Sequence, residues 1–142
     1  MMKLRKNVKI FEPELSYQVL GALFQVRKDY GLGQKESIYK KALKEELKSR
    51  WLKVEEEKSI PVLSVKSNKP IGWYRPDLIV ENKIVIEIEI YPHSYSQEHI
   101  KRTYDYLKNS EYEIAYLANY GRRKMTYKRI IFPNAKKFHR CS

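Results

Sequence analysis

Two adjoining acidic segments carry the side chains best suited to chemistry. Arg-Pro-Asp-Leu-Ile-Val occupies 75–80, and Ile-Val-Ile-Glu-Ile-Glu-Ile occupies 84–90. Because side chains alternate along a strand, Glu87 and Glu89 share one face while the isoleucines between them pack into the core. If the short turn between the segments closes a hairpin, Asp77 lies opposite Glu87, with Cβ atoms about 5 Å apart. Three carboxylates then converge.

Such a carboxylate cluster repels itself in water-poor surroundings unless protons or a divalent cation compensate its charge. Hard oxygen ligands of this kind suit Mg²⁺ or Mn²⁺. The alternative is a half-exposed strand whose outer positions happen to be acidic, which is the usual meaning of an isolated Glu-x-Glu. Three acids in a basic chain favour the metal site, because cationic walls could hold a phosphate backbone around an acidic centre.

The charge of the whole chain supports that interpretation. The 142 residues include 29 Lys and Arg against 17 Asp and Glu, a net charge of +12. No acid follows Glu113, whereas eight basic residues do. Nucleic acids and anionic membrane surfaces are the usual partners of such a charge. A merely solubilising surface is the alternative, but so long an imbalance favours a phosphate-binding face.

Composition excludes several classes of protein. Apolar residues make up 42% of the chain, enough for one core, so intrinsic disorder is excluded as the main description. No apolar run approaches the ~20 residues of a membrane span, and no secretory signal is recognised at the start. The single cysteine, Cys141, fits a reducing compartment. We therefore expect a cytoplasmic protein without membrane contact.

Hydrophobic periodicity then places the acids on elements. It predicts helices at 13–30, 35–50 and 97–109, and strands at 54–59, 61–66, 71–80, 84–90, 112–118 and 125–132. The order is ααββββαββ, with the strands from 54 to 90 expected to form a β-meander. This order indicates a single α/β domain over 1–142, with a central mixed β-sheet flanked by helices. Residues 1–12 are an N-terminal extension and 134–142 a basic C-terminal tail, of which residues 136–142 are expected to order only on binding.

Several sequence blocks resemble a known family. Residues 33–39, Gly-Gln-Lys-Glu-Ser-Ile-Tyr, fit the signature that names the GxxExxY proteins. Further blocks follow in the same order: Gly-Trp-Tyr-Arg-Pro-Asp-Leu at 72–78, the strand of Glu87, Tyr-Leu-Lys at 106–108 and Leu-Ala-Asn-Tyr-Gly at 117–121. The resemblance covers about residues 14–131. That family is similar to a compact branch of the PD-(D/E)XK nucleases, which implies a restriction-endonuclease-like core and metal-dependent cleavage of phosphodiesters.

The resemblance also implies roles for individual residues. Asp77 would be the metal-binding acid of the PD element, Glu87 the second acid, and the Ile88 carbonyl a further ligand. Glu36, on the second helix, matches a helical acid that often completes the site. A favourable charge at a helix N-terminus is the alternative for Glu36. Tyr39 is expected to pack rather than to react.

Two positions depart from the family pattern. Glu89 stands at the third motif position, normally a lysine that orients the attacking water and offsets transition-state charge, and Arg102 replaces the usual glutamine of the following helix. Some restriction endonucleases with glutamate at that position remain active, so Glu89 could be an extra ligand or a water-orienting base, with Arg102 supplying positive charge. Alternatively, the site has lost catalysis and the domain only binds.

The leading hypothesis is a Mg²⁺- or Mn²⁺-dependent nuclease acting on DNA or RNA. Asp77, Glu87, Glu89 and Glu36 would form its site, and the phosphate contacts would come from Arg75, Arg102, Arg122, Arg123 and Lys124. The alternatives are a catalytically silent nucleic-acid-binding module with the same fold, and an interaction protein for an acidic partner. The exposed tyrosines could form the interface of a homodimer. His93, His99 and His139 lack metal-ligand spacing and are expected to pack or to lie at the surface.

Overall fold

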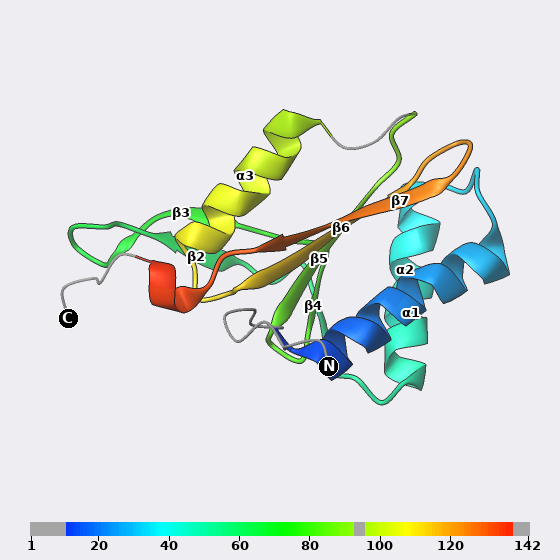
Figure 1. The fold of residues 1–142 in the computed structure, drawn as a ribbon, viewed down its shortest axis with the longest axis horizontal. Helices are drawn as coiled ribbons and strands as arrows, with labels where there is room; N and C mark the ends of the chain where they lie inside the picture. The colour runs from blue at the N-terminus through cyan, green and yellow to red at the C-terminus, as the bar shows by residue number, and fades with distance from the viewer. Residues whose placement is uncertain (1–10, 93–95, 138–142) are drawn as a thin grey trace, which may run out of the picture.

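A five-stranded mixed sheet forms the centre of the molecule, with strand order β1-β4-β5-β6-β7 (Figure 1). The computed structural model describes residues 11–92 and 96–137. Within these ranges no helix is both long and apolar enough to cross a membrane. The elements are α1 (Pro13–Tyr30), α2 (Glu36–Ser49), β1 (Val54–Glu56), β2 (Ile60–Leu63), β3 (Pro70–Tyr74), β4 (Leu78–Val80), β5 (Ile84–Glu89), α3 (Gln97–Lys108), β6 (Ile114–Tyr120), β7 (Met125–Ile131) and the 3₁₀ turn η1 (Asn134–Lys136).

The pairing directions make the sheet mixed. β1, β4 and β5 are antiparallel neighbours, and β7 is antiparallel to β6. β5 and β6 run parallel, with Glu89 beside Asn119 at their carboxyl ends. A parallel pair needs a crossover, and α3 provides it. The expected central mixed sheet flanked by helices is confirmed.

Two hydrophobic cores lie on the two faces of the sheet. One face carries Ile86 and Ile88 and packs against the buried faces of α1 and α2. The other carries Val85, together with Leu107 of α3 and Ile60 of the β2–β3 hairpin. Because side chains alternate along β5, Glu87 and Glu89 point to this second side, as expected. The acids thus stand on the face that α3 and the hairpin cover.

A tyrosine contact packs α2 against the sheet. Tyr39 of α2 is fully buried and stacks on Tyr120 of β6, with ring centroids 4.3 Å apart. Its hydroxyl donates to the Gly31 carbonyl at 2.8 Å and accepts from the Gln34 amide at 3.2 Å. The expectation that Tyr39 is a packing residue is confirmed. The contact also fixes the loop before α2, and so the first helical residue, Glu36.

The predicted β-meander and the single strand at 71–80 are wrong. The chain forms two strands there, β3 and β4, which belong to different sheets. β3 pairs only with β2 in a separate hairpin, and β4 pairs with β1 and β5. Pro76 lies between β3 and β4 and has no N–H to donate to a ladder, so the chain changes sheets at this residue. The element order is therefore ααβββββαββ, one strand longer than predicted.

The chain end is more ordered than a tail over 134–142 would be. Asn134–Lys136 form η1, and Lys137 is buried. Its ammonium donates to the carbonyls of Ser110 and Tyr112, at 2.8 and 2.7 Å, which compensates the buried charge. The expectation for the tail is therefore wrong up to residue 137. Residues 138–142, with His139 and Cys141, lie outside the described residues, as do His93 and residues 1–10 of the extension.

Candidate active site

Asp77 is held at the point where the chain enters the central sheet. Its side chain is 17% exposed. One carboxylate oxygen, Oδ2, accepts from the Ile88 N–H at 2.7 Å, and the other, Oδ1, lies 3.0 Å from the ammonium of Lys40. The register of β4 against β5 pairs Leu78 with Ile86, so the preceding residue, Asp77, continues toward Glu87 as expected. Both contacts fix Asp77 beside the carboxyl half of β5.

Glu87 receives its partners from the second face of the sheet. Its Oε2 accepts from the Tyr74 hydroxyl at 2.9 Å and from the Thr103 hydroxyl at 3.4 Å, and lies 3.7 Å from His99 Nε2. Burial, followed by the charge of Glu87, raises the pKa of Tyr74, so the tyrosine remains a neutral donor. His99 is buried, as the packing interpretation required. Glu87 is thus 15% exposed and held by α3 and β3 together.

Glu89 and Glu36 meet across the end of the sheet. Their carboxyl groups lie near enough for a hydrogen bond when one of them is protonated. Burial, then this hydrogen bond and the charges of Glu36, Asp77 and Glu87, raises the pKa of Glu89 to about 7. The acids predicted from sequence are therefore close enough to repel one another. Uncompensated negative charge of this kind favours a cation.

A close backbone approach fixes the end of β5. The Asn119 side chain accepts from the Tyr91 N–H at 2.8 Å and donates to the Tyr91 carbonyl at 3.4 Å. A Cβ atom at Gly121 would lie 2.8 Å from that same carbonyl, closer than packed atoms approach. Only glycine fits there without displacing the chain. The segment after Glu89 is thereby clamped to the end of β6.

Lys40 is the site residue that sequence reasoning missed. It lies one turn after Glu36 on α2, and its Nζ is 3.3 Å from the Glu36 carboxylate and 3.0 Å from Asp77. Burial alone would lower the pKa of Lys40. The carboxylates of Asp77 and Glu36 together raise it by more, so the net shift is upward and the ammonium stays charged. From the sequence, the Glu-x-x-x-Lys spacing at 36–40 indicates only an ion pair between Glu36 and Lys40 along the helix. The contact with Asp77 depends on how α2 packs against the sheet.

A shallow groove opens beside these residues. It has a volume of about 260 Å³, and its lining includes Glu36, Lys40, Lys41, Glu57 and Asp77. We call it the Asp77 groove. The Glu57 N–H donates to the Asp77 carbonyl at 3.1 Å, which places one wall directly against the acid. Phosphate oxygens entering this groove would meet two lysines beside the carboxylates.

The donor chemistry suits a hard divalent cation, because the carboxylates of Glu36, Asp77 and Glu87 act on Glu89 and oxygen ligands are the ones such a cation prefers. In the described part of the chain, however, no three acidic, histidine or cysteine side chains are arranged as a ready cation site. Lys40 holds Asp77, while Tyr74 and Thr103 hold Glu87. A cation at the predicted ligands would therefore have to compete with Lys40 for Asp77. The Ile88 N–H bonds to Asp77, and the role of its carbonyl as a ligand stays a prediction.

The predicted phosphate-contacting residues form a basic rim around this end of the sheet. Arg75 is exposed, and its guanidinium donates to the Ser59 hydroxyl at 3.1 Å. Arg102 is exposed on α3, and its charge reaches Tyr91, whose pKa is nevertheless raised, by burial first and then by Glu89. The remaining three stand in the exposed β6–β7 turn, just after Asn119, and are Arg122, Arg123 and Lys124.

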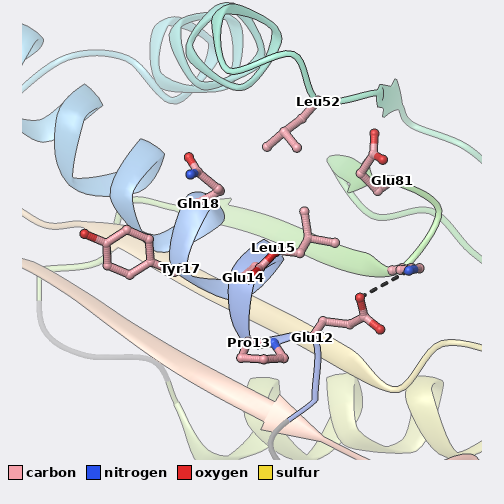
Figure 2. A pocket seen from close by; sticks show the side chains of 9 residues that line it. Glu12, Pro13, Glu14, Leu15, Tyr17, Gln18, Leu52 and Glu81 are labelled. Carbon is pink, nitrogen blue, oxygen red and sulfur yellow. Dashed lines mark hydrogen bonds and ion pairs between the residues drawn. The ribbon is translucent and has the colours of Figure 1, made fainter.

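A larger hollow lies at the other end of the sheet (Figure 2). It is formed by the start of α1, Leu52 and the β4–β5 turn with Glu81, and an ion pair of 3.2 Å joins Glu12 and Lys83 across it. Since β5 runs from this turn toward Glu89, the hollow is separated from the acidic cluster by the length of the strand. It contains none of the predicted site residues.

With the acids, the basic rim and the mixed sheet in place, the family assignment follows. The model of the PD-(D/E)XK nuclease superfamily matches residues 13–130. The chain belongs to the PD-(D/E)XK nuclease superfamily. No curated protein matches the sequence. The narrower resemblance to the GxxExxY proteins stays a prediction.

One solved structure shares the fold, and a second shows a weaker likeness. The crystal structure of SSO0001 gives a TM-score of 0.51 at 20% identity, covering 87% of this chain and 60% of that one. The alkaline exonuclease LHK-Exo from Laribacter hongkongensis gives a TM-score of 0.46 at 15% identity, covering 90% of this chain and 74% of the exonuclease. This chain therefore spans 60% of the length of SSO0001. At such identities the likeness concerns the fold alone.

Proposed function

We propose that this protein is a metal-dependent nuclease that hydrolyses phosphodiester bonds of DNA or RNA. The observation that carries the proposal is the meeting of Asp77, Glu87, Glu89 and Glu36 at one end of the sheet, within a basic rim. Membership of the PD-(D/E)XK superfamily supports it, since nucleases of that superfamily generally use divalent metals. The substrate would then be a nucleic acid.

In this proposal Asp77, Glu87 and the Ile88 carbonyl would hold Mg²⁺ or Mn²⁺, and Glu36 and Glu89 would extend the shell. A divalent cation bound there would supply Lewis acidity and lower the pKa of a bound water. The Ile88 N–H and the Tyr74 hydroxyl orient the two main carboxylates. Arg75, Arg102 and the β6–β7 turn hold the phosphate backbone.

Lys40 takes the place of the positive charge that Glu89 removes from the motif. Its ammonium is 3.0 Å from Asp77 and lines the Asp77 groove, so it faces the space where a phosphate would enter. A fixed cation beside developing phosphate charge lowers the barrier. The lysine would thus come from α2 rather than from β5, which allows Glu89 to remain acidic in an active enzyme.

Cleavage assays test the proposal directly. Labelled single-stranded, duplex and branched DNA and RNA are incubated with Mg²⁺, Mn²⁺ or EDTA. Metal-dependent cutting by the wild type is expected, and Asp77→Ala and Glu87→Ala should each abolish it. Glu45→Ala, an exposed acid of α2, is the matched control and should cut normally. Absence of cutting in Mn²⁺ on every substrate would refute the catalytic proposal.

A second candidate is a catalytically silent nucleic-acid-binding module. The favouring observation is that Lys40 already neutralises Asp77, while in the described residues no three acids form a ready cation site. This candidate expects salt-sensitive binding without cleavage, and the same affinity for Asp77→Ala and the wild type. Glu89→Lys, which restores the usual motif residue, distinguishes the two, because a site silenced only by Glu89 would gain cleavage.

A further inference from the structure

The β2–β3 hairpin presents an apolar and basic row to solvent. Along β3, Tyr74 points inward and stacks on Tyr106 of α3, with ring centroids 4.2 Å apart. Since side chains alternate, Ile71, Trp73 and Arg75 point outward. Ile71 is 72% exposed and Trp73 is 63% exposed. We call this row the hairpin platform. Large apolar side chains grouped in this way commonly mark a binding surface.

The hairpin platform is connected to the acidic cluster through both strands. Tyr74, next to Trp73, donates to Glu87 at 2.9 Å. Arg75 is two residues before Asp77, and its guanidinium contacts Ser59, two residues after Glu57 in the wall of the Asp77 groove. A ligand lying on Trp73 and Arg75 would therefore continue into the groove. The contacts of Tyr74 also hold the platform rigidly against α3.

The charge of the hairpin indicates what kind of ligand it would hold. Between Glu57 and Asp77 the chain contains no acid, and its four basic residues are Lys58, Lys66, Lys69 and Arg75. A purely apolar partner would leave these charges unused. A strand of nucleic acid uses both features, because its phosphates pair with the cations and its bases stack on an aromatic face.

We propose that the hairpin platform binds an unpaired nucleotide of the substrate, with a base stacked on Trp73 and its phosphate on Arg75. This rests on the proposed nucleic-acid substrate and specifies its form: a single-stranded segment enters the Asp77 groove across β3. A duplex keeps its bases stacked on one another and offers a free face to Trp73 only at its ends. Stacking is tolerant of sequence, so the platform selects for strandedness rather than for particular bases.

The two tryptophans of the chain allow a direct test. Trp51 is 94% exposed and follows α2, so it serves as the matched control for Trp73. Trp51→Phe leaves Trp73 as the sole tryptophan, and Trp73→Phe leaves Trp51. Each variant is titrated with an oligothymidylate strand in EDTA, which prevents cleavage, and tryptophan fluorescence is excited selectively. Saturable quenching of Trp73, without quenching of Trp51, is expected.

Affinity measurements complete the test. Trp73→Ala should weaken binding of the same strand by roughly 5- to 150-fold, the usual effect of removing one base-stacking side chain. Trp51→Ala should leave the affinity unchanged, and a relaxed closed circular duplex, which has no ends, should not quench Trp73. Circular dichroism establishes that each variant is folded. If Trp73→Ala is unfolded, Trp73→Phe is measured in its place, because it keeps a smaller aromatic face.

Three results would overturn the proposed binding at the hairpin platform. The oligothymidylate does not bind, it binds without quenching Trp73, or it quenches Trp73 and Trp51 equally. A Trp73 emission that changes with protein concentration alone would instead indicate an interface between copies of this chain. The proposed nuclease activity fails separately: quenching of Trp73 without cleavage in Mn²⁺ leaves a binding module, whereas cleavage without quenching removes only the platform.

Discussion

Asp77 and Glu89 lie in the same acidic cluster but differ in how their charge is compensated. Asp77 receives an ammonium and a backbone N–H, each within 3.0 Å. Glu89 shares a hydrogen bond with another acid, Glu36, and burial raises its pKa further. The negative charge that most needs a cation is therefore on Glu89, at the position where the family pattern has its lysine. Lys40 of α2 compensates the charge of Asp77 and Glu36.

Lys40→Ala tests that compensation. If Lys40 stabilises phosphate charge in the groove, its removal should lower cleavage by roughly 10²- to 10³-fold, the range found when one preorganised donor is lost. Stability should change by less than about 1 kcal/mol, because the ion pair is partly solvated. Rates and urea midpoints measure the two effects. Lys53→Ala, an exposed lysine near Glu81 at the other end of the sheet, should affect neither. Equal rates for Lys40→Ala and the wild type would contradict the role.

Glu89 should make the metal-free protein sensitive to pH. Its pKa is raised from about 4.5 to about 7, first by burial. Between these values the folded state binds more protons than the unfolded state, so stability should fall as pH rises from 4.5 to 7 and then level off. Denaturation midpoints across that range measure the effect. Glu89→Gln should flatten this part of the profile, whereas Glu45→Gln should not. An unchanged profile in Glu89→Gln would mean that a group other than Glu89 takes up the proton.

The sequence allowed the acids to be predicted but not their partners. Alternation along 84–90 and a short turn were enough to bring Asp77 toward Glu87, because both depend on local geometry. Lys40 could not be found in this way. Its contact with Asp77 depends on the rotation of α2 about its axis, which the packing of Tyr39 against Tyr120 decides. Long-range packing of this kind leaves no local pattern in the sequence.

At the scale of elements, the change of sheet at Pro76 brings the site and the hairpin together. β3 ends at Tyr74 and β4 begins at Leu78, so the intervening residues pass from one sheet to the other. A continuous strand over 71–80 fitted the residue types equally well, because β-propensity does not specify a pairing partner. The proline was the available signal. Its effect was to leave Asp77 outside any ladder, where its carboxylate bonds to Ile88 instead.

Gly121→Ala should disturb the clamp at the end of β5. The added Cβ would lie 2.8 Å from the Tyr91 carbonyl, so the chain after Glu89 must shift. Overpacking of this kind typically costs about 1–3 kcal/mol, measured by chemical denaturation, and cleavage should fall with it. Gly72→Ala is the matched control, since its nearest neighbour would be 3.9 Å away. Equal stability of the two variants would show that the segment after Glu89 can shift away from Gly121 without cost.

Across the whole molecule, the positive charge is organised with respect to the acids. Arg122, Arg123 and Lys124 follow Asn119, the residue beside Glu89, whereas Lys53 and Lys83 lie at the far end of β5, near Glu81. A net charge of +12 attracts any polyanion, but only the cations at the acidic end can place a phosphate near the carboxylates. The composition predicts that the protein attracts polyanions, and the fold shows that basic residues stand beside the acidic end of the sheet.

The salt dependence of binding tests that direction. Each phosphate contact on a single strand contributes about 0.7 to the slope of log affinity against log salt. Arg122→Ala with Arg123→Ala should therefore reduce the slope for oligothymidylate by about 1.4, if both arginines contact phosphates. Lys53→Ala with Lys83→Ala removes the same charge from the far end and should leave the slope unchanged. Equal reductions would mean that the molecule attracts nucleic acid through its overall charge. A loss confined to the arginine pair means that bound strands pass the β6–β7 turn on their way to Glu89.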